Sequence, residues 1–188
     1  MDRRQALKQT AILIGGTLSA STIAGVLNGC QPSGAPDWEP QFLTKEQAKL
    51  VGAIAECILP ATDSPGAKEL FVDEFIDLML KDSFSEEEQQ EFIAGLTLLE
   101  ENAQTANSKS FSKSSSDQQV SLLQSLEGEE ESPGKTFFTT MKSLTLLGYF
   151  TSETIMSEYI NHNPVPGKWE GCIDMSPDTR VSVDNNIL

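Results

Sequence analysis

The sequence predicts an all-α fold, a single irregular bundle of five to seven helices with a loop-rich C-terminal tail. Apolar residues recur at helical spacing in several stretches between residues 43 and 159. Serine or threonine, followed three residues later by glutamine or glutamate, precedes three of these stretches, which is the pattern of a capping box. No stretch competes with the alternation of apolar and polar residues that is typical of a half-buried strand.

Residues 1–29 have the three parts of an export signal: a charged start, an apolar middle and a small-residue exit. The charged start holds Arg3 and Arg4, and a mildly apolar run extends from Ala11 to Leu27. Paired arginines before such a run are typical of the twin-arginine route. Leu27-Asn28-Gly29 directly before Cys30 resembles the bacterial lipobox, whose cysteine is lipidated and becomes the new N-terminus.

A membrane-spanning helix is the alternative interpretation of this run. Glycine, serine and threonine dilute it and no cluster of stop-transfer charges follows it, whereas a spanning helix needs about 20 mostly apolar residues. We therefore expect a twin-arginine lipoprotein signal at residues 1–29 and a lipid on Cys30. The protein is then expected at the periplasmic face of the cell envelope, anchored by its lipid.

The next segment, residues 30–41, is predicted to be a lipidated tether. It holds three prolines and shows no periodicity. Residues 42–188 are expected to form one domain, which is long enough to bury a core of its own.

Two helices are expected in the first part of this domain. Thr44 and Gln47 can form a capping box for the first, which carries an apolar stripe and ends at Pro60. Residues 61–66 form a cluster of turn residues. The second helix is expected over Ala67–Asp82, and the residues on its inward face would be Phe71, Phe75, Leu78 and Met79.

A third helix is predicted to begin at a capping box of Ser85 and Glu88, with Phe92, Leu96, Leu99 and Ala103 inward. The serine-rich stretch 102–116 is expected to be a loop that Phe111 anchors in the core. A third capping box, made by Ser116 and Gln119, would start a short helix whose inward residues are Val120, Leu123 and Leu126.

The last part of the chain is predicted to hold two more helices. An acidic, turn-rich break at residues 128–135 precedes a helix over Thr136–Leu147, with Phe137, Met141, Leu144 and Leu147 inward. Residues 148–150 would interrupt it, and Thr151 or Ser152 would cap a final short helix that ends near Tyr159. The tail from Asn161 shows no regular period.

The net charge excludes some partners. The whole chain has a formal net charge of -15, and without residues 1–29 it keeps 10 basic and 27 acidic residues, a net charge of -17. Nucleic acid and an anionic membrane face would both repel such a chain, so we predict no nucleic-acid partner. The acidity is interpreted as a means of solubility.

The three cysteines leave two interpretations open. If Cys30 carries a lipid, Cys57 and Cys172 remain as a pair in a compartment where disulfides persist. A bridge between them would tie the first helix to the C-terminal tail. Alternatively, they are two unrelated buried thiols.

Sequence motifs for catalysis or for cofactor binding were not found. The chain contains no Cys-x-x-Cys-His, no Gly-x-Gly-x-x-Gly after a strand and no Gly-x-Ser-x-Gly. His162 is the only histidine, and it lies in a loop of proline and asparagine residues, where a surface or turn position is expected. His162, Cys57 and Cys172 are too scattered to suggest a metal site. Runs of glutamate at residues 86–88 and 129–131 are interpreted as helix-dipole complements and solvated charge. We therefore predict no catalytic, cofactor-binding or metal-binding residue in this chain.

Two stretches, Ala55–Ala67 and Leu144–Glu153, resemble the signature stretches of the gluconate 2-dehydrogenase subunit 3 family. A twin-arginine leader and the segment Gln118–Leu123 fit the same resemblance, which covers roughly the whole mature domain. It implies a non-catalytic small subunit of a membrane-associated dehydrogenase of sugars, sugar acids or polyols. The large subunit, a flavoprotein of the glucose-methanol-choline type, would hold FAD, and a cytochrome c subunit with haem c often takes the electrons.

The resemblance also implies that the small subunit escorts the large one through the twin-arginine route. The lipobox departs from the simplest family pattern and suggests that the lipid holds the complex at the membrane, in place of a cytochrome or beside it. Two further hypotheses remain: a free-standing envelope lipoprotein that acts as a scaffold, and an enzyme that uses a pair of carboxylates.

Candidate partner contacts lie in the two segments that break the helical stripes, residues 59–66 and 148–153. Interface cores favour the aromatic residues that occur there and in the tail. Alternatively, Tyr149 and Phe150 close the domain's own core and residues 60–66 are only a turn. The candidate contacts are Pro60, Asp63, Pro65, Gly66, Tyr149, Phe150, Glu153 and Trp169.

Overall fold

The computed structural model describes residues 38–128, 132–162, 165, 172, 174 and 182–183. All of them belong to one compact unit, Pro36–Leu188. The predicted signal with Arg3 and Arg4, the predicted lipid site Cys30 and the candidate contact Trp169 lie outside the described residues. Within the described ranges, no helix combines the length and the apolar character needed to cross a membrane.

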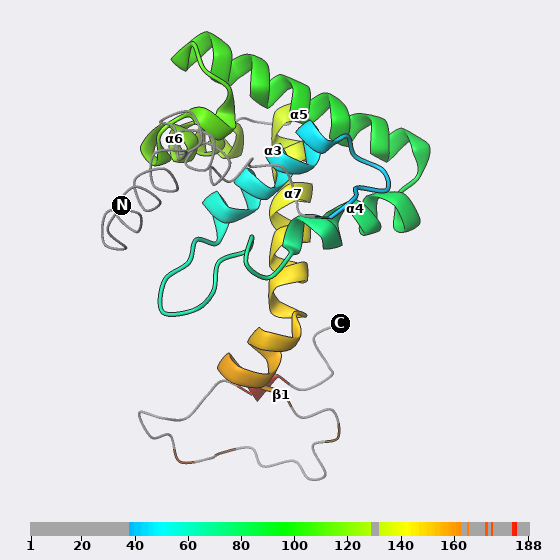
Figure 1. Cartoon of the computed structure of the whole chain (residues 1–188), viewed down its shortest axis with the longest axis vertical. Coiled ribbons are helices and arrows are strands. Elements are labelled where there is room, and N and C mark those ends of the chain that lie inside the picture. Colours follow the sequence, from blue (N-terminus) through cyan, green and yellow to red (C-terminus); the bar gives the residue numbers. More distant parts are fainter. Residues whose placement is uncertain are drawn as a thin grey trace, which may run out of the picture. The chain divides into compact units, whose positions relative to one another are not determined.

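The described chain is helical, which confirms the predicted all-α class (Figure 1). A short parallel pair of two-residue strands follows the last helix and joins Asn161 to Ser182 and His162 to Val183. The elements in order are α3 (Lys45–Ile58), α4 (Val72–Ser83), α5 (Glu86–Asn107), the 3-10 turn η1 (Phe111–Lys113), α6 (Ser116–Gly128), α7 (Pro133–Phe150), the π-helical turn η2 (Ile155–Tyr159), β1 (Asn161–His162) and β2 (Ser182–Val183).

Helix α7 is the centre of the domain. It packs against α3, α4, α5 and α6, and Figure 1 shows it running through the middle of the helical part, with α5 across one end and η2 beyond the other. A helix that is buried on several sides needs apolar residues around most of its circumference. This is the case for α7, whose buried residues are Gly134, Phe137, Phe138, Met141, Leu144, Thr145, Gly148 and Tyr149.

Two of the three predicted capping boxes are confirmed. The Thr44 hydroxyl accepts from the Gln47 N–H at 3.2 Å, and the Gln47 side chain accepts from the Thr44 N–H at 2.9 Å. Ser85 and Glu88 repeat this arrangement at the start of α5. The Ser85 backbone N–H and hydroxyl both donate to the Glu88 carboxylate and lower its pKa, because these hydrogen bonds favour the charged form.

The third capping box is displaced by one residue. Ser115, not Ser116, accepts from the Gln118 N–H at 3.4 Å, and the Gln118 side chain accepts from the Ser115 N–H at 3.0 Å. Both registers place a serine three residues before a glutamine, so the local pattern could not distinguish them. The predicted inward position of Val120 was also wrong, since its side chain is 38% exposed.

The predicted inward face of α4 was only partly right, because Phe75 and Met79 are half-buried and pack against the core but do not form its buried face. The helix begins at Val72, later than predicted, and Phe71 is exposed. The observed buried face turns two carboxylates inward and consists of Val72, Asp73, Ile76, Asp77 and Leu80. The prediction placed only apolar residues on the inward face. The two aspartates can be buried because they have hydrogen-bond partners that lie far away in sequence.

Those partners lie in the segment that leads into α3. The Asp77 carboxylate is fully buried and accepts from the backbone N–H groups of Gln41 at 2.7 Å, Phe42 at 3.2 Å and Leu43 at 2.7 Å. One turn earlier, the Asp73 carboxylate accepts from the Trp38 indole N–H at 3.3 Å. Burial raises the pKa of Asp73, while this hydrogen bond partly opposes the shift. Helix α4 therefore fixes residues 38–43 against the domain.

Two more helices are longer than predicted. Helix α5 continues to Asn107, through the first residues of the predicted loop, whereas Phe111 is fully buried as predicted. Helix α7 begins at Pro133 and runs without interruption to Phe150. Gly148 does not break it: a Cβ there would lie 2.6 Å from Cδ1 of Phe75, so this glycine lets α4 and α7 approach closely.

Candidate functional site

The structure brings the two signature stretches into contact through Tyr149. This residue is buried near the end of α7, and its hydroxyl donates to the backbone carbonyl of Pro65 at 3.1 Å. The same oxygen lies 2.9 Å from the Ser64 hydroxyl, within hydrogen-bond distance. Residues 144–153 and 55–67 thus form one unit, which we call the signature site.

Glu56, on the last turn of α3, fixes the loop of residues 60–66, which belongs to the signature site. Its carboxylate accepts from the backbone N–H groups of Ala61 at 3.2 Å and Lys68 at 3.0 Å. Inside the loop, the Ala67 N–H donates to the Leu59 carbonyl at 2.9 Å. Gly66 is required at this point, because a Cβ would meet the Glu56 carboxylate and lie 2.8 Å from the Ala61 nitrogen. The loop is therefore fixed at both ends and at its centre.

The predicted contact residues divide into two groups. Gly66 and Tyr149 are buried and Pro65 is half-buried, so these residues build the site. Pro60, Asp63, Phe150 and Glu153 are exposed. The alternative that Tyr149 and Phe150 close the domain's own core is therefore right for Tyr149 but not for Phe150, which is 47% exposed. The two rings contact each other edge to face, with their centroids 5.3 Å apart.

Two exposed aromatic residues beside the same loop were missed. Phe71 ends the turn between this loop and α4 and is 59% exposed. Tyr159 in η2 is 40% exposed, and its hydroxyl donates to the Asp63 carbonyl at 3.3 Å. No local signal separates either residue from a core aromatic, because both occur in apolar patterns of helical spacing. Their exposure depends on how η2 and the start of α4 are oriented.

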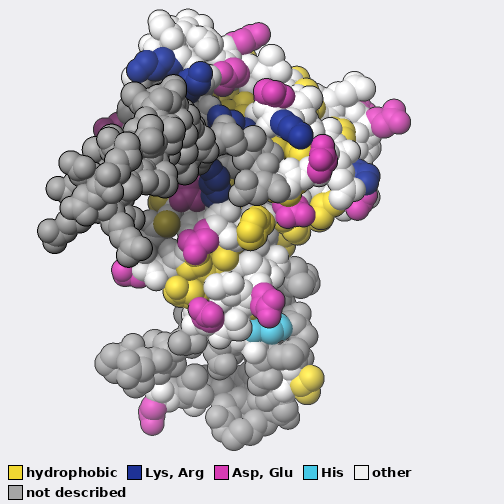
Figure 2. Space-filling model, in the orientation of Figure 1, with side chains coloured by type: hydrophobic (Ala, Val, Ile, Leu, Met, Phe, Trp, Pro, Cys, Tyr) yellow, Lys and Arg dark blue, Asp and Glu magenta, His cyan; other side chains and the backbone are white. Residues whose placement is uncertain are grey.

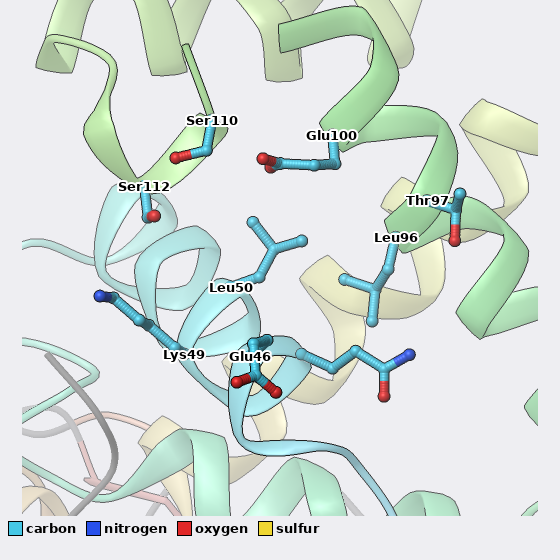
Figure 3. Close-up of a pocket in the computed structure, with 9 residues that line it drawn as sticks. Glu46, Lys49, Leu50, Leu96, Thr97, Glu100, Ser110 and Ser112 are labelled. Carbon is cyan, nitrogen blue, oxygen red and sulfur yellow. The ribbon is translucent and has the colours of Figure 1, made fainter. Parts of the chain in front are cut away.

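A groove of about 390 Å³ lies on another part of the domain, between α3, α5 and η1 (Figure 3). Leu50 and Leu96 lie at its centre, with Lys49 on one side and Glu100 and Ser110 on the other. Glu100 has a structural role there, since its carboxylate accepts from the Phe111 N–H at 3.0 Å and so fixes η1. This groove shares no residue with the signature site.

His162 lines a smaller cavity of about 350 Å³ near the end of α7, together with Thr151, Glu153, Met156 and Ser157. The sequence predicted a surface or turn position for this histidine. In the structure it is half-buried in β1, and its Nδ1 atom has no hydrogen-bond partner among the described residues.

Cys57 and Cys172 are both free thiols in the structure. Cys57 is half-buried on α3, and burial raises the pKa of its thiol, whereas Cys172 is exposed. The bridge considered from the sequence is therefore not formed here. Among the described residues, no three histidine, cysteine, aspartate or glutamate side chains are grouped so that they could hold a metal ion.

Comparison with known families identifies the chain. The sequence profile described as Gluconate 2-dehydrogenase subunit 3 matches residues 45–167, which is more than half of the chain and includes both halves of the signature site. No curated protein matches significantly. No solved structure matches significantly either. By this match, the chain belongs to the gluconate 2-dehydrogenase subunit 3 family.

Proposed function

We propose that this chain is a non-catalytic small subunit of a membrane-associated, FAD-dependent dehydrogenase of sugars, sugar acids or polyols. It assists assembly of the flavoprotein subunit and its export by the twin-arginine route. The contact between the two signature stretches, made by Tyr149 with Ser64 and Pro65, supports this proposal most directly. The family is named after one subunit of a dehydrogenase. The two signature stretches meet in a site with exposed aromatic residues, which could contact another subunit.

In this proposal, FAD is bound by a large subunit of the glucose-methanol-choline type. A cytochrome c subunit, where one is present, takes the electrons. The chain itself contributes a rigid surface. The Glu56 and Tyr149 hydrogen bonds fix the loop of residues 60–66 before any partner arrives, and a preformed contact surface lowers the entropic cost of association.

An escort that crosses the membrane with its partner needs an interface that survives transit. Obligate interfaces commonly bury about 2,000 Å² or more in total. The signature site would supply one part of such an interface, and the lipid on Cys30 would keep the assembled complex at the periplasmic face of the envelope. Because the chain is acidic, anionic lipid headgroups would repel it, so the chain would not bind the membrane surface without this lipid.

Replacement of both leader arginines by lysine tests the export role. Cells that carry the flavoprotein gene together with Arg3→Lys and Arg4→Lys are fractionated into cytoplasm, periplasm and membrane. Both this chain and the flavoprotein are expected in the cytoplasm, whereas an unrelated protein with an ordinary secretory signal remains in the periplasm. Export of the flavoprotein at the wild-type level would contradict the escort role.

Purification of the full-length chain from solubilised membranes tests the subunit role. A flavin-containing protein is expected to copurify, and dye-linked oxidation of a sugar or polyol is expected in the complex but not in this chain alone. Recovery of the chain without any flavin would favour the scaffold hypothesis. Sugar oxidation by the chain alone would favour the hypothesis of an unrecognised enzyme.

A further inference from the structure

Phe71 has an unfavourable backbone conformation and an exposed side chain. Its φ of 54° and ψ of 36° place it in the left-handed helical region, where glycine and asparagine are favoured and bulky residues are rare. Within the described ranges, Ser108 is the other non-glycine residue with a positive φ. Ser108 ends α5, where this conformation is a common way to stop a helix. Phe71 instead precedes the first residue of α4.

The backbone of Phe71 has a clear structural role, but its ring does not. The Phe71 N–H donates to the Lys68 carbonyl at 3.2 Å, and the Val72 N–H donates to the Ala67 carbonyl at 3.1 Å, so this turn joins the loop to α4. Glycine or asparagine would make the same turn with less strain. The residue is 59% exposed, so more than half of its surface is not used in packing inside the domain. A strained position with an exposed aromatic ring is typical of a functional contact.

Phe150 and Tyr159 place two more rings around the same loop. Among the described residues, these two and Phe71 are the aromatic residues with exposed side chains. The Tyr159 hydroxyl forms a hydrogen bond with the loop at the Asp63 carbonyl. Phe150 contacts the ring of Tyr149, whose hydroxyl forms a hydrogen bond with the loop at the Pro65 carbonyl. We call these three rings the aromatic face.

The charges beside the aromatic face are mainly negative. In the part of the chain that the structure describes, four carboxylates are exposed in or next to the same segments, those of Asp63, Glu69, Glu153 and Glu158, against one exposed amine, that of Lys68. On the side of the molecule shown in Figure 2, apolar side chains gather over the middle and lower part of the described surface, and the charged side chains next to them in the lower part are acidic. A partner with complementary charge would therefore present lysine and arginine around an apolar centre.

We propose that the aromatic face binds the large subunit, that Phe71 is its principal anchor, and that the large subunit presents an apolar pocket bordered by basic residues. This inference rests on the proposed function, since it names the surface that the partner contacts. Binding energy at such interfaces is concentrated in a few aromatic residues near the centre. The strain at Phe71 is then compensated in the complex, where its ring is buried.

The decisive variant is Phe71→Asn, because asparagine tolerates the left-handed conformation but lacks the ring. The full-length chain is coexpressed with the large subunit, and the amount of flavin that copurifies is measured together with the melting temperature of the variant chain. We expect roughly a tenfold or larger loss of bound flavoprotein, with an unchanged or higher melting temperature. Phe71→Tyr should retain binding, as should Val120→Ala, which removes an exposed apolar side chain on α6.

The outcomes separate this inference from the proposed function. If the wild-type chain copurifies with flavin and Phe71→Asn does so equally well, the aromatic face is not the contact and the proposed function is unaffected. A lower melting temperature for Phe71→Asn would show that the ring serves the fold, which would also overturn the inference. If the wild-type chain copurifies with no flavoprotein, both proposals fail.

Discussion

The carboxylate of Asp77, on α4, accepts a hydrogen bond from the backbone N–H of Leu43 at 2.7 Å. Leu43 directly precedes the capping box of α3, so one buried side chain determines where the first helix of the domain begins. The same carboxylate also accepts from Gln41 and Phe42. A single acceptor group thus satisfies three backbone donors of the segment that the sequence assigned in part to a tether.

The first prediction compares the two buried aspartates of α4. Asp77→Asn should lower the free energy of unfolding by about 2–4 kcal/mol, because the amide offers one acceptor oxygen to three backbone donors. Asp73→Asn keeps an acceptor for Trp38, so its free energy of unfolding at neutral pH should stay within about 1 kcal/mol of wild type or exceed it. Urea titrations of both variants measure the difference. Equal losses in the two would contradict the assigned roles.

The second prediction concerns the pH dependence that Asp73 causes. Burial raises its pKa above the ordinary value of 3.8, so the folded state binds a proton more readily than the unfolded chain. Its contribution to stability is therefore fully present below the unfolded pKa and is lost as the pH rises through the folded pKa.

Urea titrations of wild type and Asp73→Asn from about pH 4 to about pH 7 test this dependence. The variant should gain stability relative to wild type as the pH rises through that window. A difference that does not change with pH would show that the pKa of Asp73 is the same in both states.

The third prediction concerns the bond that joins the signature stretches. Tyr149→Phe removes the hydroxyl that contacts Ser64 and Pro65 but keeps the buried ring. The free energy of unfolding should fall by about 1–2 kcal/mol, and hydrogen exchange at the Thr62 amide should become faster, because the loop loses its central support. Tyr159→Phe is the matched control: it removes one exposed bond of 3.3 Å and should cost less than about 0.5 kcal/mol. Unchanged exchange in Tyr149→Phe would contradict this account.

The fourth prediction concerns the crossing of α5 and α7. A Cβ at Gly95 would overlap the ring of Phe137, which also packs against Phe92 with ring centroids 5.1 Å apart. Gly95→Ala should therefore destabilise the domain by about 1–3 kcal/mol. Gly128→Ala is the control, because no atom of the described residues outside its own helical backbone and its chain neighbours lies within 4 Å of the added Cβ. This variant should be neutral or stabilise by up to about 1 kcal/mol. Thermal unfolding should show a lower melting temperature for Gly95→Ala but not for Gly128→Ala, and a stabilising Gly95→Ala would refute the close approach.

The fifth prediction concerns the two thiols. As free thiols, both should react with a maleimide without prior reduction, Cys172 quickly and Cys57 slowly, because burial and a raised pKa keep little thiolate at Cys57 at neutral pH. The rate at Cys57 should increase as the pH rises. If neither thiol reacts before reduction, and a mobility shift on non-reducing gels disappears in Cys172→Ser, the bridge considered from the sequence forms after all.

Much of the helical architecture could be predicted because its signals are local. Capping boxes at Thr44 and Ser85 and the apolar stripes of α3, α5 and α7 act over a few residues, and the structure confirms them. The errors occur where a residue has a distant partner. Asp73 and Asp77 are polar in sequence but buried, because their acceptors meet backbone and indole donors more than thirty residues away. Gly148, predicted to break a helix, instead admits the ring of Phe75.

The candidate site was half predictable for the same reason. The two signature stretches were recognised from their residues alone, yet no local property of Tyr149 indicates that its hydroxyl reaches Pro65 while the adjacent Phe150 turns outward. The sequence by itself determined the helical class, the acidic surface and the family, since periodicity, charge and motif are properties of neighbours along the chain. Only the tertiary structure decided which aromatic rings are buried and which are exposed, because the buried face of a helix is set by the elements that pack on it, here α4 and η2 against α7.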